Sequence, residues 1–173
     1  MTRLARHWPW AALFTSAAML AIAHAFQTFA HLSPCELCLK QREGYWIAMG
    51  IATAGLVWRQ FLPGKIGPFD PTRLIAILLA LAFLAETALA VYHAGVEWKF
   101  WPGPASCSGG ATRVDPAELE RLLSGAKMSI PQCDKPAWVF LGLSMAGWNA
   151  LAAAALSAGS AAAALPARKG TPA

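Results

Sequence analysis

Long apolar runs decide what this chain can fold into. The first run, residues 10–30, contains no Asp, Glu, Lys or Arg, and about 20 such residues are enough for a helix to cross the hydrocarbon core of a bilayer. Three further apolar runs follow. The sequence therefore predicts an all-α membrane protein, with one domain of four transmembrane helices spanning residues 1–173. The expected spans cover about 10–30, 44–62, 74–92 and 137–156.

The composition agrees with this fold class. Hydrophobic residues make up 57% of the chain and charged residues 13%, whereas apolar residues, Gly included, make up about 45–50% of an ordinary soluble domain. The formal net charge of +5 does not indicate nucleic-acid binding, because the basic residues do not form one stripe among aromatic side chains.

A cleaved signal peptide is the alternative for the first run. Arg3 and Arg6 precede it, and Ala23-His24-Ala25 resembles a small-x-small cleavage site. The run continues beyond that point and further spans follow, so a retained helix is favoured. His24 is expected to pack within the bundle or to face the interface.

A Cys-x-x-Cys motif separates the first two runs. Ser33 and Glu36 form a Ser-x-x-Glu capping signature, which predicts that a helix starts at the cysteines. On that helix Cys35, Cys38 and Arg42 would share a face. A helix N-terminus and a guanidinium both favour the reactive thiolate. The spacing favours a redox pair, with a zinc half-site or two inert cysteines as alternatives.

The only long hydrophilic segment, residues 93–136, holds the other two cysteines. Pro and Gly residues surround Cys107 and Cys133 and predict irregular backbone there. Between them Asp115 and Glu118 repeat the capping pattern ahead of three leucines, which predicts a short amphipathic helix lying on the membrane. An even number of cysteines in so short a chain fits disulfide chemistry in an oxidising compartment.

One carboxyl group falls inside the third expected span. A charge at that depth is costly, so Glu86 is expected to be protonated, to be paired or to face the bundle interior. A structural hydrogen bond is favoured over a role in moving protons.

The number of spans places the two cysteine pairs together. Both termini and the 59–73 segment would lie on one side of the membrane, with the cysteine-bearing loops 31–43 and 93–136 on the other. Lys and Arg are equally numerous on the two sides, but several of those in the second loop lie far from any span and count less. This favours cytoplasmic termini, with the thiols outside, where disulfides persist.

Several segments around the cysteines closely resemble one known family. They are residues 35–42, 92–97, 101–107, 133–136 and 140–145. They are similar to the DsbB family, the quinone-dependent disulfide-forming proteins of the bacterial inner membrane. The resemblance covers all four expected spans.

The resemblance implies a function and a partner. A four-helix bundle of this family reoxidises a periplasmic dithiol oxidase of the DsbA type, which has a thioredoxin fold. Cys107 would form the mixed disulfide with that partner, and Cys133 would be its pair. Cys35 and Cys38 would take over the electrons, with Cys38 adjacent to ubiquinone or menaquinone.

The resemblance also implies two residues beside the cofactor. Arg42 matches the family arginine next to the quinone ring, while His93 would either cap the end of its span or donate to the quinone. Gln41 stands where the best-known members carry an acid, so the resemblance transfers no charged role to that position.

The main alternative from another class is a metal-handling membrane protein. It would bind one ion with all four thiolates, about 2.3 Å from each sulfur. The bound ion would protect the cysteines from thiol reagents, and a chelator would remove that protection. Disulfide exchange instead predicts two separable pairs and no metal. A paralogue serving a dedicated partner would carry the same motifs. A protein like vitamin K epoxide reductase is less favoured, because its Cys-x-x-Cys lies at a different helix.

Overall fold

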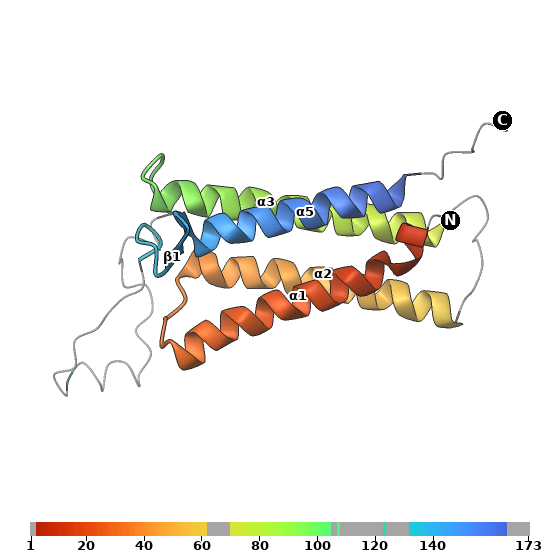
Figure 1. Ribbon diagram of the computed structural model, residues 1–173, viewed down its shortest axis with the longest axis horizontal. Coiled ribbons are helices and arrows are strands. Elements are labelled where there is room, and N and C mark those ends of the chain that lie inside the picture. The colour runs from red at the N-terminus through yellow and green to blue at the C-terminus, as the bar shows by residue number, and fades with distance from the viewer. Residues whose placement is uncertain (1–2, 62–69, 105–106, 108–122, 124–131, 166–173) are drawn as a thin grey trace.

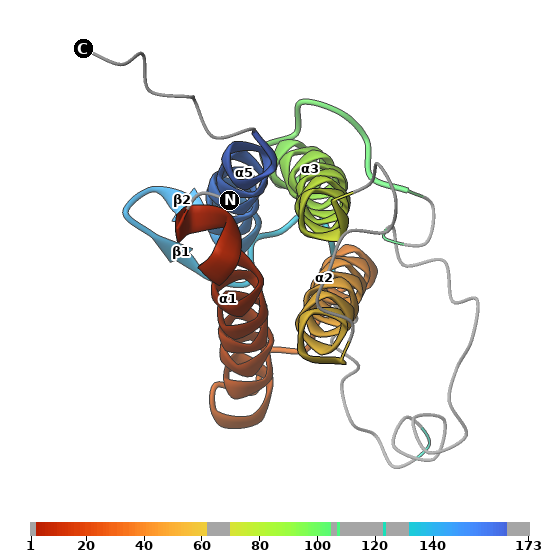
Figure 2. The same cartoon turned by 90° about the vertical axis from the view of Figure 1, so that its right-hand side faces the viewer.

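Four long helices run antiparallel along one another in the described part of the chain (Figure 1). The computed structural model describes residues 3–61, 70–104, 107, 123 and 132–165. Figure 2, seen along the helices, shows that they follow one another around the bundle in chain order. They are α1 (Arg3–Phe29), α2 (Glu36–Phe61), α3 (Pro71–Glu97) and α5 (Met145–Ala164).

Two of these helices have the length and hydropathy of membrane spans. They are Arg6–Phe29 and Pro71–Glu97, with mean hydropathies of 1.4 and 2.5. The other two, α2 and α5, are 26 and 20 residues long. Polar residues lower the mean hydropathy of both helices: the segment 40–43 at the head of α2 and Asn149 in α5. The predicted all-α fold with four long helices is confirmed.

The fourth helix starts later than the sequence predicted. The span expected at 137–156 opens instead with a hairpin of β1 (Val139–Phe140) and β2 (Leu143–Ser144), and α5 follows. The two turn residues, Leu141 and Gly142, have φ of 50° and 79°, as a two-residue type I′ turn requires. Apolar residues 137–144 therefore form a hairpin, and the predicted start of this span was wrong.

The bundle interior is lined by small residues and a few large ones. Alanines and aromatic rings pack between the helices, while many large aliphatic side chains point outward. Small residues let helices approach closely, which suits a bundle surrounded by lipid. The buried cluster consists of Ala12, Leu20, Tyr45, Ala48, Ala52, Leu79, Phe83 and Leu156.

A buried polar network crosses this interior. Asn149 Nδ2 donates to Glu86 Oε1 at 2.8 Å, and the Tyr45 hydroxyl donates to Asn149 Oδ1 at 2.5 Å. The three side chains come from α3, α5 and α2. A Cβ at Gly44 would clash with the Glu86 carboxylate, so the glycine makes room for it. The structural hydrogen bond expected for Glu86 is confirmed.

Asn149→Leu is expected to destabilise the bundle by about 1–3 kcal/mol, because both Glu86 and Tyr45 then lose their buried partner. Glu86→Gln keeps the acceptor oxygen, so its free energy of unfolding is expected to stay within about 1 kcal/mol of that of the parent. Thermal unfolding in detergent measures both. An equal loss of stability in the two variants would contradict the role of Glu86 as the acceptor of the Asn149 hydrogen bond.

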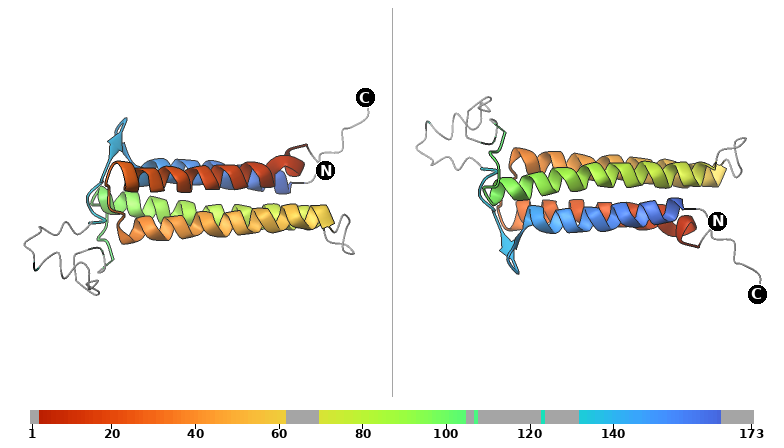
Figure 3. Two further views of the ribbon diagram at one scale, coloured as in Figure 1. Left: turned by 90° about the horizontal axis from the view of Figure 1, so that it is seen from below. Right: turned by 90° about the horizontal axis from the view of Figure 1, so that it is seen from above.

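The bundle has one end that carries the cysteines. The last turns of α1 and α3, the first turns of α2 and α5, and the hairpin all lie there, opposite the start of α1 (Figures 1 and 3). The amphipathic helix predicted from Asp115 and Glu118 lies outside the described residues. The four cysteines themselves are all described, and they meet at this end.

Candidate redox site

Cys35 caps the second helix. Its carbonyl accepts from the Leu39 amide at 3.1 Å, which is the first bond of the helix, and its sulfur accepts from the Cys38 amide at 3.4 Å. These two bonds place Cys35 at the N-cap position of α2, where Ser33 was predicted; that prediction was wrong by two residues. The helix does start at the cysteines, and Cys35 occupies the position where a negative charge is most favoured.

The two sulfurs of the motif lie close together. Cys35 Sγ and Cys38 Sγ are 3.1 Å apart, within hydrogen-bond reach of each other, and the Cys38 thiol is the donor when Cys35 is the thiolate. This hydrogen bond is the largest cause that lowers the pKa of Cys35 to about 4, and it outweighs the opposing effect of burial. His93 and the Cys38 amide also lower it. The same bond raises the pKa of Cys38, so the pair holds its negative charge on Cys35.

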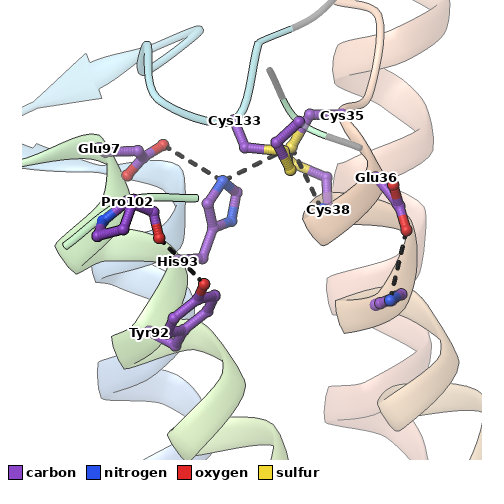
Figure 4. The surroundings of a disulfide bond; sticks show 10 residues. Cys35, Glu36, Cys38, Tyr92, His93, Glu97, Pro102 and Cys133 are labelled. Carbon is purple, nitrogen blue, oxygen red and sulfur yellow. Dashed lines mark hydrogen bonds and ion pairs between the residues drawn. A yellow bond between two sulfur atoms is a disulfide. The ribbon is translucent and has the colours of Figure 1, made fainter. Parts of the chain in front are cut away.

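His93 approaches this pair from α3. Its Nε2 lies 3.6 Å from Cys35 Sγ and 3.9 Å from Glu97 Oε1 (Figure 4). The ring is only 2% exposed, and its Nδ1 has no hydrogen-bond partner within the described part of the chain. The imidazole therefore joins α3 to the Cys-x-x-Cys motif of α2.

Glu97 was not singled out as a site residue from the sequence. It is held by Ser144, whose hydroxyl donates to the Glu97 carboxylate and also accepts from the Gly147 amide at 3.1 Å. The carboxylate thus links α3 to the first turn of α5. The only sequence signal was its spacing of four residues from His93, which places the two side chains on one helix face.

The second cysteine pair forms a disulfide that packs against the first pair. Cys107 and Cys133 are 26 residues apart in sequence and bonded to each other, which is the pairing that the resemblance implies. Both are buried in one cluster with Cys35, and Cys38 packs on it. Figure 4 shows Cys133 beside Cys35 above the head of α2.

Contacts in the flanking segments hold this disulfide in place. Lys99 Nζ donates to the Asp134 carbonyl at 2.8 Å and pairs with its carboxylate, holding the pKa of that carboxyl below its ordinary value. Trp101 Nε1 donates to the Tyr92 carbonyl at 2.9 Å, and the two rings stack. The chain leaving α3 and the chain entering the hairpin are therefore tied together around Cys107 and Cys133.

A cavity opens beside the first pair. Its volume is about 420 Å³, within the range of small-molecule sites, about 300–1,000 Å³. The residues that line it combine apolar side chains with the two thiols and His93. They are His31, Leu32, Ser33, Cys35, Cys38, His93, Glu97, Gln132, Lys135, Pro136, Ala137 and Met145.

Arg42 does not line this cavity. Its guanidinium donates to Gln27 Oε1 at 2.8 Å and to the Ala23 carbonyl at 3.2 Å, both on α1. The side chain therefore joins α1 to α2 one turn beyond Cys38. The sequence placed Arg42 on the face of Cys38, and the structure adds that its hydrogen bonds go to α1.

The four-thiolate metal site considered from the sequence is not formed. Cys107 and Cys133 are bonded to each other, so they offer no thiolates, and only Cys35 and Cys38 are free. The cysteines thus form two pairs, as disulfide exchange predicts.

Comparison with known proteins decides the family. The family model described as "Disulfide bond formation protein DsbB" matches residues 5–163. The chain belongs to the DsbB family. It is therefore a membrane oxidoreductase involved in disulfide bond formation, built, like its family, from four transmembrane helices.

Individual relatives agree with this assignment. The chain is 31% identical to Disulfide bond formation protein B of Pasteurella multocida, over 80% of this chain and 74% of the relative. It is 32% identical to the protein of that name from Dechloromonas aromatica, over 77% and 76% of the two chains. It is also 26% identical to "Uncharacterized protein RP370" of Rickettsia prowazekii, over 76% and 72%. No solved structure matches this DsbB-family chain.

The low pKa of Cys35 predicts unusual reactivity in acid. In the reduced chain, the rate of Cys35 alkylation by iodoacetamide should stay level as the pH falls from 8 to 5 and should drop only near pH 4. The alkylation rate of an ordinary cysteine, with a pKa of about 8.5, would fall about tenfold for each pH unit over that range. Mass spectrometry of the labelled peptide follows the rate in a Cys107→Ser/Cys133→Ser background.

The Cys38→Ala variant is the control for this measurement. It removes the donor that contributes most to the low pKa of Cys35, so the pH at which labelling slows should move upward. A parent chain whose labelling already slows below pH 8 would contradict the assignment of the thiolate to Cys35.

Proposed function

We propose that this protein is a thiol:quinone oxidoreductase that reoxidises a periplasmic dithiol oxidase of the DsbA type. Electrons would pass from the partner to Cys107/Cys133, then to Cys35/Cys38, and then to a quinone. The observation that carries the proposal is the single buried cluster that packs the Cys107–Cys133 disulfide against Cys35 and Cys38.

The first step exchanges one disulfide for another. A partner thiolate attacks the sulfur of Cys107, the Cys107–Cys133 bond breaks, and Cys133 leaves as the thiolate. The partner's second thiolate then attacks the mixed disulfide, so the partner is oxidised and Cys107 and Cys133 are both reduced. Since both sulfurs are buried, the partner must first draw this segment away from the end of the bundle.

The second step transfers the pair of electrons within the protein. A thiolate of the reduced Cys107/Cys133 pair attacks a Cys35–Cys38 disulfide, and exchange leaves Cys35 and Cys38 reduced. Direct contact between the two pairs suits this reaction, because exchange requires one sulfur to reach another. The low pKa of Cys35 makes it the better leaving group of its pair.

The residues around the first pair fit a quinone headgroup. The cavity has apolar walls from Leu32, Pro136, Ala137 and Met145, and it contains both thiols. A buried imidazole whose Nδ1 lacks a partner, that of His93, also lines it. Ubiquinone or menaquinone would supply a two-electron, two-proton acceptor there. The side chain of His93 would hold a proton near the reacting sulfur of Cys35.

Arg42 would contribute a permanent positive charge next to the pair. Its guanidinium lies one turn beyond Cys38 and is fixed by Gln27 and the Ala23 carbonyl on α1. At the α1–α2 contact this charge would stabilise negative charge that develops on the Cys35/Cys38 pair or on a bound acceptor.

The same geometry supports an orientation in the membrane. All four cysteines lie at one end of the bundle, and the starts of α1 and α3 lie at the other (Figure 3). Stable disulfides require an oxidising compartment. We therefore place the cysteine end in the periplasm and the termini in the cytoplasm of a bacterial inner membrane, with spans in the four helices.

The test is quinone reduction by the purified protein in detergent. With a reduced thioredoxin-fold dithiol oxidase as donor, the unchanged protein should reduce ubiquinone or menaquinone catalytically and without sensitivity to a chelator. The Cys107→Ser variant should lose this turnover, since it can no longer accept the partner's electrons. Equal turnover by the two chains, or no turnover with either quinone, would refute the proposal.

A further inference from the structure

Three metal-binding atoms meet at the head of α2. They are the sulfurs of Cys35 and Cys38 and the Nε2 atom of His93, and all lie within 4.8 Å of one another. Thiolates and imidazole are the ligands that Zn²⁺ prefers in proteins. Cys35 and His93 are buried, while Cys38 is partly exposed. This group is different from the four-cysteine site considered above, because it uses only one pair and a histidine.

We propose that the reduced protein binds one Zn²⁺ ion at Cys35, Cys38 and His93, and that the ion blocks reoxidation of the pair. The site would exist only while Cys35 and Cys38 are thiols. It is therefore a redox-gated inhibitory site, which the disulfide-forming activity of the family does not itself require.

One of the three ligand-to-ligand distances already matches a tetrahedral zinc site, and the other two require small side-chain movements. With Zn–S near 2.3 Å and Zn–N near 2.0–2.1 Å, the edges of a tetrahedron are about 3.6 Å for S–N and about 3.8 Å for S–S. The Cys35 Sγ to His93 Nε2 distance is 3.6 Å. The two sulfurs, 3.1 Å apart, would have to separate by less than about 1 Å, within reach of small side-chain rotations.

The cavity supplies an entry path and a fourth ligand. Cys35, Cys38 and His93 all line it, so a water molecule can complete the tetrahedron, as in open three-ligand zinc sites. The Glu97 carboxylate lies 3.9 Å from His93 Nε2, and its charge favours a cation. Lys135 also lines the cavity and opposes a cation, which keeps the ion exchangeable.

Binding would be controlled by oxidation without any electron transfer to the metal. The Cys35 thiolate and the Cys38 thiol bind one Zn²⁺ as two thiolates and release the proton of Cys38. Once Cys35 and Cys38 form a disulfide, their sulfurs lie about 2.05 Å apart and carry no charge, so two of the three ligands are lost. A bound ion in turn occupies the thiolates that exchange and reoxidation need.

The experiment measures Zn²⁺ binding directly. The full-length protein in detergent is prepared reduced and then oxidised, and each form is titrated with Zn²⁺ in competition with a coloured chelator. A Cys107→Ser/Cys133→Ser chain, which keeps only Cys35 and Cys38, is titrated in the same way. We expect about one equivalent bound by the reduced forms of both chains, and at least a tenfold loss of affinity on oxidation.

Substitutions then identify the ligands. Cys38→Ser and His93→Gln should each weaken binding at least tenfold, whereas His24→Gln on α1 should bind as the parent does. Circular dichroism confirms that each variant is folded, and Co²⁺ in place of Zn²⁺ should give thiolate-to-metal absorption with tetrahedral bands. The comparison of reduced and oxidised protein needs no substitution, so the test survives a variant that fails to fold.

Three results would overturn the proposal. They are equal binding by the reduced and oxidised chains, loss of binding in the Cys107→Ser/Cys133→Ser chain, and unchanged binding in His93→Gln. Binding is measured without quinone or partner, so its failure is distinguishable from failure of the proposed function. In a working quinone assay, stoichiometric Zn²⁺ should slow reoxidation of the reduced chain, and a chelator should restore it.

Discussion

Replacing Cys38 with serine is expected to reduce quinone turnover by on the order of a thousandfold or more, yet to leave one round of partner oxidation intact. The Cys107–Cys133 disulfide is still present in this variant and can accept two electrons from the partner. The electrons then stop, because Cys35 alone cannot form the intramolecular disulfide that receives them. A rapid-mixing experiment should show one equivalent of partner oxidised, followed by no further change.

The Cys35→Ser variant and the Cys35→Ser/Cys38→Ser double variant are the controls. The two sulfurs act as a unit, 3.1 Å apart, so the double variant should be no slower than either single one. Continued turnover in any of the three chains would contradict the relay, since it would mean that the Cys107/Cys133 pair reduces the quinone directly.

Replacing His93 with alanine is expected to slow reoxidation of the reduced Cys35/Cys38 pair by on the order of a hundredfold. The imidazole lies 3.6 Å from the sulfur of Cys35, and it helps to lower the pKa of that thiol. Oxidation of the partner by Cys107/Cys133 should be nearly unchanged, because His93 acts on the other pair. Stopped-flow measurement of the two half-reactions separates these effects.

His24→Ala is the matched control for this variant. His24 lies on α1, and its ring nitrogen interacts with the Leu20 carbonyl of the same helix at 2.8 Å. It should leave both half-reactions at the parent rate. If His93→Ala slowed partner oxidation as strongly as reoxidation, the histidine would be holding the whole cysteine end together and would have no specific role at Cys35.

The four-helix bundle could be predicted because a run of about 20 apolar residues indicates a helix that spans the bilayer. The sequence also placed a helix start at Cys35 and Cys38, because capping residues act locally. It misplaced the cap by two residues, since a cysteine sulfur replaced the Ser33 hydroxyl as the acceptor. It also extended the fourth span through residues 137–144, because a short hairpin of apolar residues has the same hydropathy as a helix.

Contacts between segments far apart in the chain could not be predicted from the sequence. Glu97 could be related to His93 by helix spacing, but its bond to Ser144 depends on how α3 meets α5. Glu86 was expected to find a partner, but nothing in the sequence pointed to Asn149 on another helix. Likewise, Arg42 was placed on the face of Cys38, and only packing shows that its hydrogen bonds go to α1.

The most direct test of the central claim follows the redox state of each cysteine pair in time. The oxidised, quinone-loaded protein is mixed with reduced partner, quenched with acid and an alkylating agent, and each cysteine is assayed by mass spectrometry. We predict that Cys107/Cys133 becomes reduced first, Cys35/Cys38 next, and quinol appears last. Quinol formation while Cys35 and Cys38 stay in one redox state would contradict the account.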